Sequence, residues 1–379
     1  MHSWFRQLMG AAFAAAVLFG PSAHAQLPVI RQHNLVTDDP ALNPAVLTDP
    51  LAKNMWGVSF SGASPFWVSN NGTGFATLYS VNPTTNAPTK VGLEVKLPGD
   101  GTVTGQTFNS NTVGGAFNAD TFLFVNEDGT ISGWRGALGT TAEVLQTGST
   151  ANVYKGSAFG TIGSHSYLYA ANFRTGAIDV LKGDTGAPSL TGNFTDPGLP
   201  SGFAPFNIQQ LSGKLYVTYA LQDPTKHDDV AGAGNGFVDA FDLNGNLLGR
   251  IGSMGTLDSP WGLALAPSTF GMYSGDLLVG NFGDGRINAF NLASNMFVGQ
   301  LGTENGQPVS IDGLWSLTPG NGGQGGSPGL LYFTAGTFDE QHGLFGSLQA
   351  VPEPGAALWG LAALVPAGIF LRRRKRSAK

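Results

Sequence analysis

The sequence contains no cysteine among its 379 residues. This absence excludes disulfides, thiolate nucleophiles, cysteine-ligated zinc and iron–sulfur centres. A domain of this composition must be stabilised by burial of apolar surface, and a chain of about 330 residues can bury enough of it.

Positive charge is scarce in the body of the chain. Of the 19 Lys and Arg residues, Arg6 and the six after Leu371 lie at the ends, which leaves 12 between Gln26 and Pro354 against all 25 Asp and Glu. The formal charge of that span is −13. Nucleic acids and anionic lipids require clustered Lys and Arg, so we expect no nucleic-acid partner.

Long helices and common catalytic motifs are also absent from the central sequence. Between Gln26 and Ala350 there is no amphipathic helical pattern of ten or more residues. The chain has no H-E-x-x-H pair, no G-x-S-x-G elbow and no P-loop, so the usual metalloprotease, acyl-transfer and nucleotide signatures are missing.

Glycine, with 56 residues, marks the turns of a repeated unit. Each unit has an apolar, aromatic run, a turn with Asn or Asp and Gly, and then alternating apolar positions, as in Phe122–Val125 followed by Asn126–Trp134. This pattern is typical of a hairpin between two strands. The corresponding glycines are Gly74, Gly129, Gly176, Gly236, Gly285 and Gly343.

A second apolar run lies upstream of several hairpins, and we expect it to be the innermost strand of each unit. Its small residues would let neighbouring backbones approach closely. Trp56, Trp261 and Trp315 occupy corresponding positions in it, which favours packing between units over stacking on carbohydrate. The runs are Trp56–Val58, Phe206–Ile208, Trp261–Leu263 and Leu314–Leu317.

Six such units predict an all-β fold for residues 26–350, a six-bladed β-propeller of four-stranded antiparallel blades. An array of β-sandwiches is the alternative, but no Pro- or Ser-rich linker separates the units. The sixth unit supplies only three strands. We therefore expect Ile30–Val36 to pair with it as the fourth and close the ring.

The N-terminal residues 1–25 have the pattern of a signal peptide. Arg6 provides a positive start, Leu8–Phe19 an apolar segment and Ala23–Ala25 a cleavage site. We expect a signal helix, export, and removal by signal peptidase before Gln26.

The C-terminal residues 351–379 contain three parts in order. Pro352-Glu353-Pro354 precedes an uncharged run, Gly355–Leu371, which predicts a transmembrane helix, and Arg372, Arg373 and Arg374 begin a basic end that should stay cytoplasmic. This order resembles the PEP-CTERM sorting signal. The resemblance implies recognition by an exosortase in the inner membrane of a Gram-negative bacterium, transient anchoring there, and release to the cell envelope or beyond. An ordinary single-pass anchor is the alternative.

The central repeats also resemble a known family. Asn54–Val58, Asn126–Trp134, Gly280–Asn288 and Asp339–Gly346 are similar to segments of exported NHL-like β-propeller proteins, some of which end in the PEP-CTERM tail. The resemblance implies fold and location, and it provides no catalytic residue.

Two clusters are candidates for chemistry. Asp223, Asp228 and Asp229, beside His227, could hold a hard cation such as Ca²⁺, although a solvated loop explains them as well. Asp339, Glu340 and His342 could act as acid, base and ligand, although they also fit a hairpin turn. We expect no other cofactor.

Taken together, the sequence favours a binding or structural component of the cell envelope or extracellular matrix, with polysaccharide as a candidate partner. The alternative is a hydrolase or lyase centred on the propeller channel that uses Asp and Glu. A catalytic site predicts carboxylates with raised pKa values at one mouth of the channel, with or without a histidine. A binding module predicts a polar or aromatic face without them.

Overall fold

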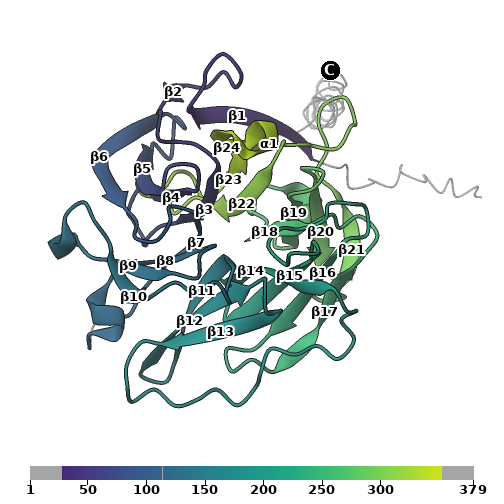
Figure 1. Cartoon of the computed structure of the whole chain (residues 1–379). Helices are drawn as coiled ribbons and strands as arrows, with labels where there is room; N and C mark the ends of the chain where they lie inside the picture. The colour runs from purple at the N-terminus through teal and green to yellow at the C-terminus, as the bar shows by residue number, and fades with distance from the viewer. Residues whose placement is uncertain (1–27, 113, 352–379) are drawn as a thin grey trace, which may run out of the picture.

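The computed structural model describes residues 28–112 and 114–351. Six antiparallel sheets surround a central axis, each with its first strand at the centre (Figure 1). The predicted six-bladed β-propeller is therefore confirmed.

The innermost strands form a closed ring in which each contacts the next, including the last with the first. Small residues permit this approach: a Cβ on Gly57 would lie 2.6 Å from the Thr104 carbonyl oxygen, and one on Gly105 2.6 Å from the Ser157 nitrogen. The inner strands are β3 (Met55–Ser59), β7 (Val103–Phe108), β11 (Tyr154–Ile162), β14 (Phe203–Leu211), β18 (Pro260–Leu265) and β22 (Leu314–Pro319).

The second and third strands of each blade form the predicted hairpins. The second strands are β4 (Phe66–Asn70), β8 (Phe122–Asn126), β12 (His165–Asn172), β15 (Lys214–Leu221), β19 (Leu277–Asn281) and β23 (Leu331–Gly336). The third strands are β5 (Phe75–Val81), β9 (Ile131–Trp134), β13 (Ala177–Lys182), β16 (Gly236–Phe241), β20 (Ile287–Asn291) and β24 (His342–Val351).

The outer strands complete five blades, and the third blade differs from the prediction because it has three strands. Pro188, Pro197 and Pro200 follow β13, and proline cannot donate to a strand ladder. The outer strands are β6 (Pro88–Lys96), β10 (Glu143–Gln146), β17 (Leu247–Ser253), β21 (Met296–Gln300) and β1 (Val29–Thr37); β2 (Leu47–Thr48) pairs with β1 in parallel.

Strand β1 closes the ring as expected. It pairs antiparallel with β24 from Val29 opposite Val351 to Thr37 opposite Leu344. The sixth blade thus combines the two ends of the described chain, and the edge that β24 would otherwise expose is paired (Figure 1).

Helices in residues 28–112 and 114–351 are short, and none of them is long and apolar enough to cross a membrane. The expected signal helix in 1–25 and the transmembrane helix of the sorting tail lie outside the described residues. The helices present are η1 (Ala116–Ala119), η2 (Gly136–Leu138), η3 (Gly271–Tyr273) and α1 (Thr337–Glu340).

Four of the six repeat glycines act as turn residues with positive φ: Gly74, Gly129, Gly176 and Gly285. The prediction was wrong for Gly236 and Gly343, which lie inside β16 and β24. These two are needed for close approach: a Cβ would lie 2.5 Å from Pro260 Cδ and 2.0 Å from the Ala52 carbonyl oxygen, respectively.

The hairpin turns and the loops that enter the inner strands share one face of the ring, which we call the upper face. The turns between the first and second strands share the opposite, lower face. The channel therefore has an upper and a lower mouth, and their side chains differ.

Candidate functional site: the upper channel mouth

All six inner strands carry a β-bulge at the same place, near the upper mouth. A bulge leaves one extra residue outside the ladder and redirects its side chain. The residues at this position are Trp56, Thr104, Lys155, Phe206, Trp261 and Trp315.

Four of these residues are aromatic, and they fill the channel. Trp56 and Trp315 stack with ring centroids 3.6 Å apart, and Trp261 meets Trp56 edge-on at 6.1 Å. All three tryptophans are at most 4% exposed. The expected role of these tryptophans in packing between blades is confirmed, and they form an apolar floor below the upper mouth.

Lys155 is the charged member of this layer and is 2% exposed. Its ammonium group pairs with Glu127 and with Asp228, the latter at 3.1 Å, and lies 5.3 Å from the Trp56 ring. Burial would lower the pKa of Lys155, but the two carboxylates outweigh it and the pKa is raised. The ammonium therefore stays charged. Removing either carboxylate would leave this buried charge without full compensation.

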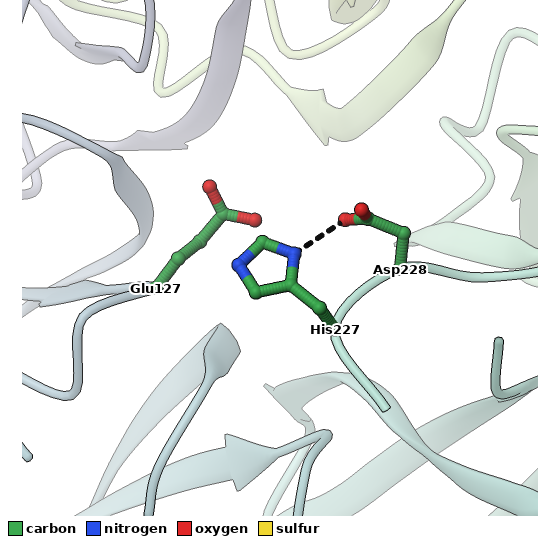
Figure 2. Close-up of side chains that lie close together, drawn as sticks. All are labelled: Glu127, His227 and Asp228. Carbon is green, nitrogen blue, oxygen red and sulfur yellow. Dashed lines mark hydrogen bonds and ion pairs between the residues drawn. The ribbon is translucent and has the colours of Figure 1, made fainter. Parts of the chain in front are cut away.

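Glu127 and Asp228, the two carboxylates that pair with this lysine, form a compact group with His227 (Figure 2). Their ligand atoms lie within 4.8 Å of one another. His227 Nδ1 is 2.9 Å from Asp228 Oδ1, and the ring lies between the two carboxylates. The carboxylate of Asp228 thus orients the imidazole and leaves Nε2 available on the side of Glu127.

Glu340, in the turn between β23 and β24, reaches the same mouth. Its carboxylate accepts a hydrogen bond of 2.6 Å from Asn54 Nδ2. Asn54 Oδ1 accepts from the indole nitrogens of Trp56 and Trp315, at 2.9 and 3.1 Å. The Glu340 carboxylate is therefore fixed to the aromatic floor through Asn54.

Asn71 links the two acids of the mouth. Its Oδ1 accepts from Asn54 Nδ2 at 3.2 Å, and its Nδ2 donates to Glu127 Oε2 at 3.2 Å. One hydrogen-bonded chain thus extends from Glu340 through Asn54 and Asn71 to Glu127 and Lys155.

Unusual backbone conformations place several of these residues. Phe338, Asp339 and Glu340 have φ of 55°, 53° and 62°, so the turn labelled α1 is largely left-handed, and Asn54 has φ of 44°. A left-handed conformation costs roughly 1–2 kcal/mol per residue for side chains with a Cβ. Such strain persists where the surrounding structure enforces it, and it is frequent at functional sites.

Two acids of the upper mouth have raised pKa values. Burial raises the pKa of Glu340, against the opposing hydrogen bond from Asn54, and burial also raises the pKa of Asp229. For Asp228, burial is outweighed by the charge of Lys155 and the pKa is lowered. The mouth therefore contains both a carboxyl group that binds its proton more tightly and a carboxylate that stays ionised.

The structure distributes the predicted metal ligands among different roles. Asp228 joins Glu127 and His227, whereas Asp223 accepts from its own loop, including the His227 amide at 2.8 Å. Burial raises the pKa of Asp229, and Ser259 and Lys155 oppose that rise. The three aspartates thus do not form one ligand set.

The predicted catalytic trio also separates. His342 Nδ1 lies 2.9 Å from Asp38 Oδ2, where it anchors the segment after β1. Asp339 is exposed, and only Glu340 reaches the upper mouth. The residues missed from the sequence are Glu127, Lys155, Asn54 and Asn71. The sequence did contain a signal for Lys155. It precedes a glycine, as Trp56 and Trp261 do, which would have placed it at the corresponding position of an inner strand.

The lower mouth differs from the upper mouth in the charge of its lining residues. A cavity of about 280 Å³ is lined there by inner-strand residues of five blades, and none of its lining residues is Asp, Glu, Lys, Arg or His. The aromatic layer separates this neutral cavity from the charged upper mouth.

These features define the class: the chain is a six-bladed β-propeller with a charged, lysine-centred upper mouth. No family model matches it. It is 30% identical over 327 residues to the uncharacterized protein R648 of Acanthamoeba polyphaga mimivirus, covering 81% of this chain and 77% of the relative. The chain belongs to the same family as R648. A second mimivirus protein, L690, is 34% identical over 202 residues, 52% of this chain and 51% of L690.

Solved structures share the fold at low sequence identity. The α-L-arabinofuranosidase Arb93A of Fusarium graminearum superposes with a TM-score of 0.53 at 12% identity, covering 85% of this chain and 98% of the enzyme. The α-L-arabinanase of Penicillium chrysogenum gives 0.51 at 10% identity, covering 86% and 98%. At these identities the likeness concerns the fold alone.

Proposed function

We propose that the upper mouth is a catalytic site that hydrolyses an uncharged ester, lactone or glycoside by general acid–base catalysis. The observation that carries this proposal is the oriented pair of His227 and Asp228 beside Glu127, at the same mouth as Glu340 with its raised pKa. The alternative function considered from the sequence was a hydrolase centred on the channel. Such an enzyme would have carboxylates and a histidine at one mouth of the channel, as the upper mouth does.

The residues have distinct roles in this scheme. His227, oriented through Nδ1 by Asp228, accepts a proton from the attacking water at Nε2. Glu340, whose raised pKa favours the protonated form, donates a proton to the departing oxygen. Lys155 keeps Glu127 and Asp228 in place and partly neutralises them, which lets a neutral substrate approach the mouth.

The test is hydrolysis of a panel of p-nitrophenyl esters, p-nitrophenyl glycosides and lactones by the full chain in a detergent without sugar groups. His227→Asn and Glu340→Gln should each reduce kcat/KM by about 10²-fold or more. His165→Asn is the matched control, because His165 forms a similar pair with Asp184 at 3.1 Å near the lower face. Turnover that is absent throughout the panel, or equal in His227→Asn and the control, would contradict the proposal.

The cellular setting that we propose is outside the inner membrane of a Gram-negative bacterium. Residues 1–25 direct export, and exosortase acts through Pro352, Glu353 and Pro354 with the basic end Arg372–Arg374. Mass spectrometry of protein from such a host should show a chain that starts at Gln26. If replacing Pro352 and Pro354 by Ala leaves tail processing unchanged, the exosortase link is wrong. A binding role in the envelope, including association with polysaccharide, remains a proposal for the same location.

A further inference from the structure

The cavity at the lower mouth has the features of a binding site. Its volume of about 280 Å³ lies near the lower end of the range for small-molecule pockets. It is formed by the lower ends of β3, β7, β11 and β14 with one residue of β22, so its walls belong to the innermost strands of the ring. A monosaccharide-sized ligand, or one unit of a longer chain, matches this space.

One polar wall is pre-organised. Gln106 is 6% exposed, and its Nε2 donates to the carbonyl oxygens of Gly57 at 2.8 Å and Trp67 at 2.9 Å. These bonds fix the amide, whose Oε1 accepts from Ser59 Oγ at 3.1 Å. The hydroxyl of Ser59 keeps its acceptor capacity for a ligand group.

Other polar groups at the cavity are unused. The Ser157 hydroxyl is buried and has no hydrogen-bond partner among the residues that the structure describes. The side-chain amides of Gln209 and Gln210 likewise make no hydrogen bond within the described residues, and both line the cavity. A buried hydroxyl without a partner is unfavourable by about 1–3 kcal/mol, so these groups favour a polar ligand.

The chemistry of the walls restricts the ligand class. No ionisable side chain lines the cavity to balance a charged ligand, and Phe60 and Phe108 provide apolar surface beside the amides. The amide and hydroxyl groups of the cavity can hydrogen-bond to hydroxyl groups of a ligand. The neighbouring phenyl rings can contact the C–H groups that alternate with those hydroxyls. We propose that the lower-mouth cavity binds a neutral saccharide unit. This proposal does not depend on catalysis at the upper mouth, because the aromatic layer lies between the two sites.

The experiment is a titration of the full chain, in the same sugar-free detergent, with neutral mono- and disaccharides, followed by ligand-observed NMR and calorimetry. Gln209→Leu and Ser157→Ala should each raise Kd at least about fivefold, the loss expected for one hydrogen bond. Ser157→Ala removes a hydroxyl without a protein partner, so its folding should be intact. Gln307→Leu, at an exposed glutamine of the upper face, is the matched control.

This titration can either support or overturn the proposal. Saturable binding that Gln209→Leu weakens, and that His227→Asn and Gln307→Leu leave unchanged, supports the proposal. The proposal is overturned if no neutral saccharide binds, if uronic acids or sulfated sugars bind more tightly than neutral ones, or if Gln209→Leu equals its control. Loss of hydrolysis with retained saccharide binding would separate the two sites.

Discussion

Lys155 carries a charge, whereas four of the other five bulge residues are aromatic and the fifth is Thr104. It balances Glu127 and Asp228 from within the floor, at the place where a bound cation could otherwise balance them. The ammonium competes with any metal for the same two carboxylates. For this reason we expect the unmodified chain to bind Ca²⁺, the candidate cation considered from the sequence, only weakly at this site.

Replacing this lysine by an uncharged residue should make the site bind divalent cations more tightly. We expect Lys155→Met to lower the stability by about 3 kcal/mol, since two carboxylates lose their buried partner. We also expect Mn²⁺, and less so Ca²⁺, to raise its Tm more than that of the unmodified chain, because His227 adds a nitrogen ligand. Thermal melts with and without each ion measure both effects.

Lys90→Met is the control for this prediction. Lys90 also lies between two carboxylates, Asp49 at 2.9 Å and Glu94 at 2.6 Å, but no histidine joins them. A similar Mn²⁺ response in Lys155→Met, Lys90→Met and the unmodified chain would show that the upper mouth has no special affinity for cations.

At the scale of elements, β1 joins the N-terminal end of the described chain to the sixth blade. Eight of its nine residues pair with β24, and it buries Ile30, Leu35 and Val36. These side chains join the apolar clusters of blades five, six and one. Blade six without β1 would expose a long edge beside the hairpin that carries Glu340.

Deletion of residues 26–38 therefore should lower the Tm by ~10 °C or more and increase aggregation through the open edge. The measurement is differential scanning calorimetry together with light scattering. Replacing Gln32 by Ala is the control, since this exposed residue lies in the same strand. An unchanged Tm after the deletion would mean that the ring is stable without its closing strand.

For the whole molecule, buried acids in the blades set the pH dependence of stability. Burial raises the pKa of Asp239 to about 7 and that of Asp120 to about 6, against the opposing charges of Arg250 and Arg135. The folded chain therefore holds protons that the unfolded chain releases. Stability should fall as the pH rises from about 4 to about 7.

Below this range the opposite shift acts. Asp223, with its pKa lowered to about 2 despite burial, loses its loop hydrogen bonds on protonation, so stability falls again in strong acid. The Tm should be highest near pH 4 and several degrees lower at pH 8. Asp239→Asn should flatten the decline between pH 5 and 8. A Tm that increases steadily from pH 5 to 8 would refute this account.

The sequence predicted the fold well because the repeat is local. A turn with Asn, Asp and Gly and an alternating apolar strand are visible within ten residues, as at Asn126–Trp134. The third blade was mispredicted because prolines after β13 replace its outer strand. Gly236 and Gly343 were assigned to turns because a glycine needed for close approach looks the same in sequence as one needed for positive φ.

The upper mouth was predictable only in part. Glu340 and Asp228 were found through their acidic neighbours, whereas Glu127 and Lys155 are 28 positions apart and meet only when blades two and three pack together. Asn54 and Asn71 resemble ordinary turn residues. Their role arises from partners on the sixth and second blades, to which no local pattern points.

The pairing of Val29 with Val351 has a consequence for orientation. Strand β1 starts beside the end of β24 at the lower face, so the two ends of the described chain lie side by side there. A propeller held at a surface through its C-terminal segment would turn the neutral cavity toward that surface and the lysine-centred mouth toward the surrounding medium. Substrates would then arrive from solution, while a saccharide at the surface would meet the other side of the ring.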